Sequence, residues 1–208
     1  MSNLFGGDSD NALELLRNDH DEAKRLFDQY EDCREEADAA TRLEIVESVC
    51  VALLVHAQVE QELFYPSLRG AEDADDALDE AAVEHHAMRQ LIAQLRDETP
   101  GDALYDAKLK VLGEYVRHHV REEEHEIFAK ARGADIDLEK LGRRMKARRE
   151  ALMQDPPVPE PARPHRSTAS KPAVRSGARF GTLKPTAVAR SRAATPKPKT
   201  RRAPTRSR

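Results

Sequence analysis

Residues 46–63, VESVCVALLVHAQVEQEL, contain the pattern that decides the fold. Apolar side chains recur there every three or four residues, which is the spacing of one buried face of an α-helix. These apolar residues are Val46, Val49, Leu53 and Leu63. His56 and Glu60 occupy the same face, at positions where the spacing calls for apolar side chains. The stretch therefore predicts a helix that carries a histidine and a glutamate, one turn apart, into a protein core.

Three more stretches have helical periodicity, so that predicted helices cover about residues 10–33, 41–68, 73–98 and 102–132. Each of the other three also has a histidine on its apolar face. Their faces comprise Leu13, Leu16, His20, Ala23 and Phe27, then Leu78, Ala81, His85, Met88, Ile92 and Leu95, then Leu109, Leu112, Val116, His119, Glu123 and Ile127. The last of these repeats the His-x-x-x-Glu spacing. Short connections predict antiparallel neighbours, so we expect an all-α, up-down four-helix bundle.

The chain divides into two parts with opposite charge. A short amphipathic helix over about 136–153 closes the predicted domain, residues 10–153. Residues 155–208 hold fourteen Lys and Arg against two acidic residues, a net charge of +12, which leaves −16 for residues 1–154. The second part is rich in proline and poor in large apolar side chains, so we expect a disordered basic tail over 154–208. It is either a solvated linker, an arm that folds back on the acidic bundle, or a contact to nucleic acid or another acidic partner.

The composition bounds the class of protein. Aromatic residues make up 4% of the chain and there is no Trp, which favours helices over sheets. We find no signal peptide and no apolar run near the ~18 residues of a membrane span. Cys33 and Cys50 form no CxxC pair, which is typical of a reducing compartment. We therefore expect a cytoplasmic monomer or weak oligomer without a membrane contact.

A metal centre explains the polar residues on the apolar faces. An unpaired buried carboxylate costs several kcal/mol, and this core is expected to contain two. Cations would balance their charge, and four imidazoles with two carboxylates exceed the ligands that one tetrahedral zinc needs. A single core histidine is more often hydrogen-bonded than metal-bound. The coincidence on four helices instead favours a site made of His20, His56, Glu60, His85, His119 and Glu123.

With these residues in place, the chain resembles the hemerythrin-like HHE cation-binding domain family. The resemblance covers about residues 10–150 and is carried by five segments. They are Asn18-Asp19-His20, the run from His56 to Pro66, Glu84-His85-His86, the run from His118 to Phe128, and Leu138 to Met145. The resemblance implies two carboxylate-bridged iron ions, with manganese or zinc as other occupants, held by the same six residues. It also implies that dioxygen, peroxide or nitric oxide is the small ligand.

Two positions depart from the oxygen-carrying members of that family. Arg89 stands where those proteins have a further histidine ligand, one turn after His85. Glu123 follows its histidine at a spacing of four, where they have an aspartate at a spacing of five. Reaction with the small ligand is therefore favoured over reversible oxygen carriage. The alternative is a non-enzymatic iron or oxygen sensor, or metal-binding regulatory protein, whose basic tail contacts nucleic acid or a protein partner.

Overall fold

The computed structural model describes residues 9–159, all of whose regular structure is helical. In chain order the elements are α1 (Ala12–Cys33), α2 (Ala39–Val59), η1 (Glu60–Phe64), α3 (Tyr65–Leu68), α4 (Asp75–Arg96), α5 (Tyr105–Glu122), η2 (Glu123–Ile127), α6 (Phe128–Gly133) and α7 (Leu138–Gln154). Here η1 and η2 are single π-helical turns, through which α2 continues into α3 and α5 into α6. The expected four long helices and the closing helix are therefore confirmed.

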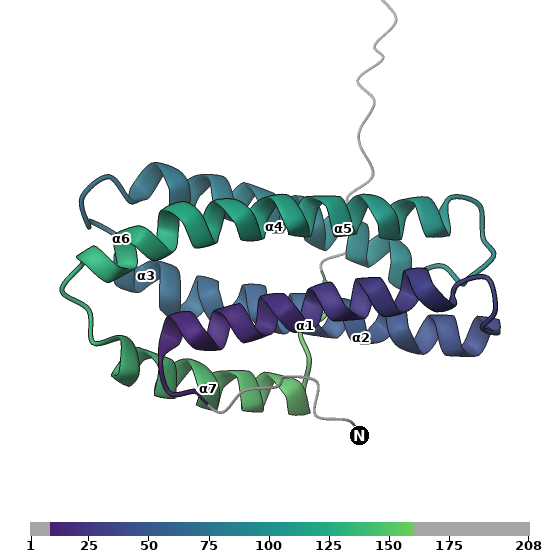
Figure 1. Ribbon diagram of the computed structural model, residues 1–208, viewed down its shortest axis with the longest axis horizontal. Coiled ribbons are helices and arrows are strands. Elements are labelled where there is room, and N and C mark those ends of the chain that lie inside the picture. Colours follow the sequence, from purple (N-terminus) through teal and green to yellow (C-terminus); the bar gives the residue numbers. More distant parts are fainter. Residues whose placement is uncertain (1–8, 160–208) are drawn as a thin grey trace, which may run out of the picture. The chain divides into compact units, whose positions relative to one another are not determined.

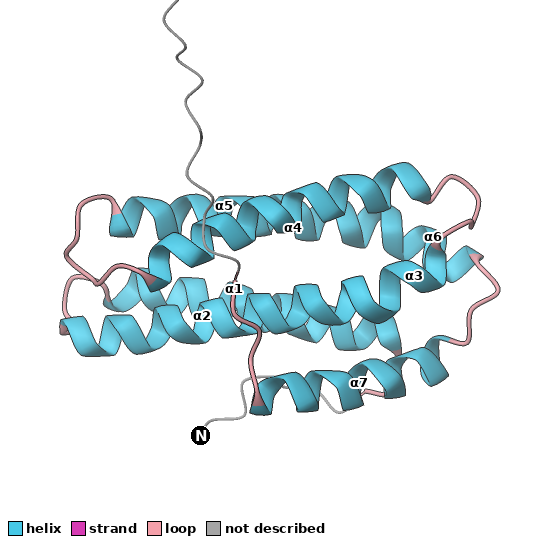
Figure 2. Ribbon diagram, turned by 180° about the vertical axis from the view of Figure 1, so that it is seen from behind, coloured by secondary structure: helices cyan, strands magenta, loops and turns pink. Residues whose placement is uncertain are grey.

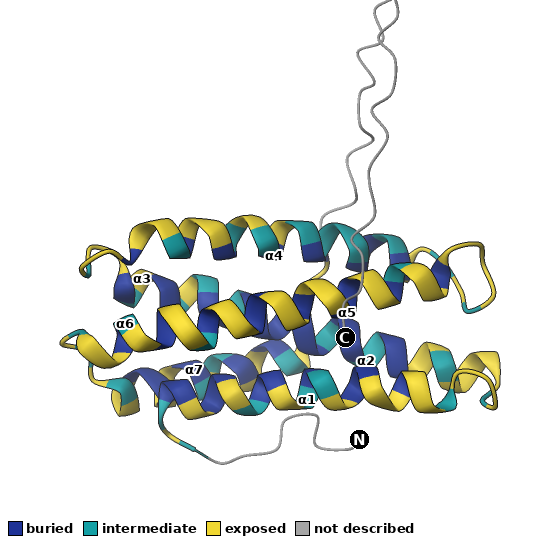
Figure 3. Ribbon diagram, turned by 45° about the horizontal axis from the view of Figure 1, so that its top comes forward, coloured by how far each residue is buried: buried dark blue, intermediate teal, exposed yellow. Residues whose placement is uncertain are grey.

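The long helices form two layers. In Figure 1, α4 and α5 make one layer and α1 and α2 the other, while α7 lies against the outer side of the second layer. The view from behind in Figure 2 shows the same arrangement, with short loops joining antiparallel neighbours. Buried residues gather on the faces that the layers turn toward each other (Figure 3). These faces are the apolar stripes of the sequence, now packed as one core.

Side chains just before α1, α2 and α7 accept hydrogen bonds from backbone N–H groups in the first turns of these helices. Asn11 Oδ1 accepts from Leu13 N at 3.0 Å, which starts α1. Asp38 Oδ1 accepts from Thr41 N at 2.8 Å, so α2 begins two residues before the predicted start. The predicted start at Thr41 was wrong because Asp38, three residues earlier, caps the helix.

The two π turns are the main departure from the predicted helices. Each turn starts at the glutamate of a His-x-x-x-Glu pair, because Tyr65 N donates to Glu60 O and Phe128 N donates to Glu123 O, five residues back. One extra residue per turn rotates the rest of the helix. Leu63, which the regular spacing placed in the core, is consequently only half-buried, whereas Tyr65 is buried.

Helix α7 packs on α1 and α2 at a close contact. Gly142 of α7 touches the start of α1: a Cβ atom at this position would lie 2.0 Å from the backbone oxygen of Asp10 and 2.6 Å from Ala12 N. Only a residue without a side chain fits there. The glycine therefore allows α7 to approach the N-terminal end of the bundle.

Three further expectations concern the basic tail, membrane spans and the two cysteines. The basic tail expected over 154–208 lies almost wholly outside the described residues. Within residues 9–159, no helix is both long enough and apolar enough to cross a membrane. Cys33 and Cys50 are both free thiols, and Cys50 is buried.

We predict that Gly142→Ala destabilises the protein by about 1–3 kcal/mol, because the added methyl group must push α7 away from the backbone of α1. Gly133→Ala is the matched control, since a Cβ there has no neighbour within 4 Å. Urea unfolding followed by circular dichroism measures both changes. Equal stability of the two variants would contradict the close contact.

Candidate metal centre

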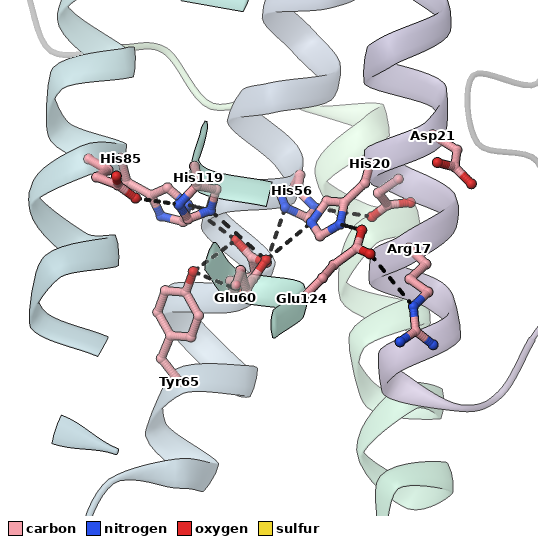
Figure 4. A network of polar contacts seen from close by, with 12 residues as sticks. Arg17, His20, Asp21, His56, Glu60, Tyr65, His85, His119 and Glu124 are labelled. Carbon is pink, nitrogen blue, oxygen red and sulfur yellow. Dashed lines mark hydrogen bonds and ion pairs between the residues drawn. The ribbon is translucent and has the colours of Figure 1, made fainter. Parts of the chain in front are cut away.

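The six residues predicted as ligands meet in the middle of the bundle. His20 comes from α1, His56 from α2, His85 from α4 and His119 from α5, while Glu60 and Glu123 are the first residues of the π turns. All six are buried, and Glu60 and Glu123 are 0% and 1% exposed. Figure 4 shows His20 and His56 on one side of Glu60, and His85 and His119 on the other.

One half of the cluster is formed around His20 and His56. His20 Nε2 lies 3.1 Å from Glu123 Oε2, and His56 Nε2 lies 3.1 Å from Glu60 Oε1. Donor atoms of these four residues all lie within 4.8 Å of one another. The group offers two nitrogen and two oxygen atoms to a single ion, a set that suits first-row transition metals.

The other half is formed around His85 and His119. Their Nε2 atoms are 3.0 Å apart, and His85 Nε2 lies 3.3 Å from Glu60 Oε2. Glu60 therefore has one oxygen atom near each half of the cluster. Glu123 also reaches this half, since its Oε2 atom lies 3.9 Å from His119 Nε2. Both carboxylates are placed between the two groups of histidines, where bridging oxygen atoms would lie.

The two halves are related by the order of residues along the chain. Each half has a histidine on its first helix and a His-x-x-x-Glu pair on its second, and each first histidine lies beside the glutamate of the opposite half. The contacts of the outer ring nitrogens, Nδ1, also repeat between the two halves. The residue before the first histidine, Asp19 or Glu84, contacts the second histidine of its own half. The arrangement is a pseudo-symmetric pair of sites.

The outer nitrogen of each second histidine faces a carboxylate. His56 Nδ1 lies 3.5 Å from Asp19 Oδ2, and His119 Nδ1 lies 2.8 Å from Glu84 Oε2. A carboxylate on Nδ1 keeps the proton on that nitrogen and leaves the Nε2 lone pair directed inward. Four inward Nε2 atoms are what metal ligation by these rings needs.

The residues after the two glutamates contact the first histidines, and here the halves differ. Glu124 Oε1 lies 2.8 Å from His20 Nδ1, whereas the equivalent residue near His85 is Gln61, whose Nε2 lies 3.4 Å from His85 Nδ1. Arg89 donates to Gln61 Oε1 at 2.6 Å and so holds the amide oxygen away from the ring. The contact between Arg89 and Gln61 thus leaves His85 with a longer outer contact than His20 has.

Helix α7 reaches the cluster through one buried ion pair. Arg149 Nη1 donates to Asp19 Oδ1 at 2.5 Å, and Asp19 contacts His56 through its other oxygen. Arg149 and Asp19 are only 6% and 2% exposed. The closing helix therefore helps to fix the orientation of His56, a role that its amphipathic sequence did not indicate.

Tyr65 lies directly against both carboxylates because of the first π turn. Its hydroxyl is 3.2 Å from Glu123 Oε1 and 3.4 Å from Glu60 Oε2. Burial and the two nearby negative charges raise the pKa of Tyr65 well above its usual value, so it stays a neutral donor. Figure 4 shows its hydroxyl directed at the carboxylates, and its ring stacks on the ring of His85 with 5.7 Å between the ring centres. Helical spacing alone does not place this residue at the cluster, because the π turn leaves no mark in the sequence.

Charges in the metal-free cluster are balanced by protons. Burial opposes charge on His20 and His56, but adjacent carboxylates outweigh it and raise the pKa of both rings. Burial, with repulsion from Glu123, raises the pKa of Glu60. Burial and the neighbouring His119 lower the pKa of His85. Bound cations would replace these protons.

Several cluster atoms that could coordinate a metal have no hydrogen-bond partner. They are His20 Nε2, His56 Nε2, Glu60 Oε1 and Glu123 Oε2, all fully enclosed. An unsatisfied buried polar atom costs about 1–3 kcal/mol, so leaving four of them together is unfavourable. Coordination would use all four lone pairs. The residues present therefore fit a metal centre.

A pocket lies beside the four histidines. It has an empty volume of about 450 Å³, part of it open to solvent, and is bounded by Met88, Arg89, Ile92 and Val116 among others. Neither Glu60 nor Glu123 lines it, whereas all four cluster histidines do. The enclosed part of this space is about 20 Å³, which is room for one molecule of about the size of water beside the cluster.

The remaining histidines of the bundle lie outside the cluster, in accord with their positions off the apolar stripes. His86, His118 and His125 are exposed. His118 contacts Glu84 and Glu122 on the surface, at 3.5 and 3.3 Å.

A family model described as the hemerythrin HHE cation-binding domain matches residues 11–131. A DNA nickase from Nostoc sp. (strain PCC 7120) is 27% identical over 125 residues, which are 59% of this chain and 34% of the nickase. The chain thus spans about a third of that relative. The crystal structure of a hemerythrin HHE cation-binding domain-containing protein from Mycobacterium kansasii has a TM-score of 0.59 at 24% identity, covering 69% of this chain and 88% of the other. This last likeness concerns the fold.

We predict that Arg149→Met destabilises the metal-free protein by about 3 kcal/mol, because it leaves the buried carboxylate of Asp19 without its cation. The double variant Arg149→Met with Asp19→Asn should recover part of that loss, since both charges of this ion pair are then removed. Thermal and urea unfolding of the metal-free chains measure both effects. A single variant as stable as the wild type would show that the buried ion pair contributes nothing.

Proposed function

Because the chain belongs to the hemerythrin HHE cation-binding domain family, we propose that its bundle holds two iron ions. The observation that carries the proposal is the convergence of four inward imidazole nitrogens on two buried carboxylates, each of which has one oxygen atom without a hydrogen-bond partner. The ligands are His20, His56, Glu60, His85, His119 and Glu123.

Each ion has its own pair of histidines in this proposal. His20 and His56 would hold one ion, His85 and His119 would hold the other, and the carboxylates of Glu60 and Glu123 would serve both. Imidazole and carboxylate donors also accept manganese and zinc. The number of donors and the lack of a thiolate speak against a single structural zinc.

The small ligand is dioxygen, peroxide or nitric oxide, taken up in the pocket beside the histidines. Bound iron supplies the redox chemistry that such molecules require, and six protein ligands shared by two ions leave coordination positions free. The pocket walls around the histidines are largely apolar, with Met88, Ile92 and Val116 among them, and they limit access of water. Arg89 adds a positive charge that favours an anionic oxygen species at the same place.

A second candidate function is a sensor that reports metal occupancy to a partner. It is favoured by the chain of contacts from His56 through Asp19 to Arg149 of α7, because α7 leads directly into the basic segment. The partly matching relative described as a DNA nickase adds support for nucleic acid as that partner. Residues 155–208, at +12, would bind it through the phosphates.

We predict that His56→Ala and Glu60→Ala each lower the iron content of protein purified from iron-supplied cells. Both variants should also lose the increase in stability that iron binding gives the wild type, because bound metal stabilises the folded state and not the unfolded one. His86→Ala is the control, since His86 is exposed and outside the cluster. Metal analysis, the optical spectrum and the melting temperature are the measurements. Wild-type iron stoichiometry in both ligand variants would rule out the assigned ligands.

We further predict that the full chain retards DNA in a gel at low salt and that a chain ending at residue 154 does not. The affinity should fall steeply with salt, as expected when phosphates release their counterions. Repeating the titration with iron-loaded and metal-free protein tests the sensor. No retardation at low salt would exclude nucleic acid as the partner, and equal affinities in the two states would exclude metal control of binding.

A further inference from the structure

The two halves of the pseudo-symmetric centre differ in what covers them. In the first half, the residues on α2 around His56 include Val55 and Val59, which are fully buried in the part of the bundle on which α7 packs. Their equivalents around His119 in the second half are His118 and Glu122, which are exposed. Likewise Asp19 is covered by Arg149, whereas its equivalent Glu84 is reached by solvent.

The exposed face of the second half carries a set of donor atoms with the spacing of a metal site. Atoms of Glu84, His118 and Glu122 all lie within 4.8 Å of one another. His118 Nε2 is 3.5 Å from Glu84 Oε1 and 3.3 Å from Glu122 Oε1. Two carboxylates and one imidazole form a set that suits divalent first-row ions such as Fe²⁺ and Mn²⁺.

Glu84 belongs to this surface set and also touches the buried centre. Its Oε1 atom faces His118, while its Oε2 atom lies 2.8 Å from Nδ1 of His119. The carboxylate of Glu84 therefore contacts both the surface set and a ligand of the buried centre. Asp19 holds the equivalent place in the first half, but its second oxygen is occupied by Arg149.

A hollow beside the surface set extends to the centre between α4 and η2. It is a small space of about 20 Å³, and it is lined by Glu80, Glu84, His119, Glu122, Glu123 and Glu126, with three apolar residues. Glu123 is almost fully buried, and its Oε2 atom has no hydrogen-bond partner. The same hollow thus has exposed carboxylates at its mouth and two predicted ligands of the core in its wall.

We propose that Glu84, His118 and Glu122 form a second cation site, which captures a divalent ion at the surface and delivers it through this hollow to the buried centre. Carboxylates lining the passage lower the energy of a cation throughout its path. An exposed site of few ligands releases its ion readily, as transfer requires. No redox step is involved, because the ion enters and leaves the surface site as a divalent cation. Delivery rests on the proposed iron centre, whereas capture does not.

Capture is tested with Mn²⁺ as the probe, on full-length protein purified with its iron. Electron paramagnetic resonance counts free and bound Mn²⁺. We expect one bound Mn²⁺ per chain beyond the iron, with an affinity that falls about fivefold or more in Glu122→Gln, the factor for losing about 1 kcal/mol of attraction from a unit charge. His118→Ala should weaken binding similarly. Glu139→Gln and His86→Ala are the matched controls, because both residues are exposed and neither belongs to the set.

Delivery is tested by adding Fe²⁺ without oxygen to the metal-free full-length chain and following uptake over time. Glu122→Gln and His118→Ala should fill the centre several-fold more slowly than the wild type and the controls, yet reach the same final iron content. Equal final content separates a loading defect from damage to the centre.

Two results would overturn the proposal. The surface site is wrong if Mn²⁺ binding is absent, or is unchanged by Glu122→Gln and His118→Ala. Delivery is wrong if uptake rates in these variants equal those of the controls. Failure of the iron centre itself would look different, because the wild-type chain would then lack iron at the end of loading.

Discussion

Two buried carboxylates between four imidazole rings are the constraint on which the rest of this structure depends. Glu60 and Glu123 are excluded from water, and an uncompensated charge there would be strongly destabilising. Each of the four long helices contributes a histidine toward them, and a π turn starts at each glutamate. Residues around the rings orient them with Nε2 inward. The bundle is thus built around charge that protons balance without metal and that cations would balance better.

The ligands of the centre are arranged with pseudo-symmetry, but the residues around them differ between the two halves. Arg149 of α7 covers Asp19 in the first half, and the corresponding Glu84 of the second half meets solvent and His118. Arg89 adds a second asymmetry, because it draws Gln61 away from His85, while Glu124 contacts His20 directly. One side is therefore tied to the closing helix, and the other provides the proposed route for the ion. The two halves of the centre therefore have similar ligands but different surrounding residues.

The sequence predicted the bundle and brought the six cluster residues to notice because both follow from one regular spacing. Histidines and glutamates on apolar stripes are visible without coordinates. The π turns were not, since a single inserted residue leaves no mark in the periodicity, and Leu63 was misplaced accordingly. Asp19 with Arg149 was also missed, because contacts between residues 130 positions apart depend on how α7 docks. Helix starts depend on single caps, as Asp38 shows.

The most direct test of the central claim is a crystal structure of the iron-loaded protein with anomalous scattering measured at the iron edge. The account predicts two iron peaks per chain, one beside His20 and His56 and one beside His85 and His119, with Glu60 and Glu123 between them. A single peak, or peaks away from these residues, would contradict it.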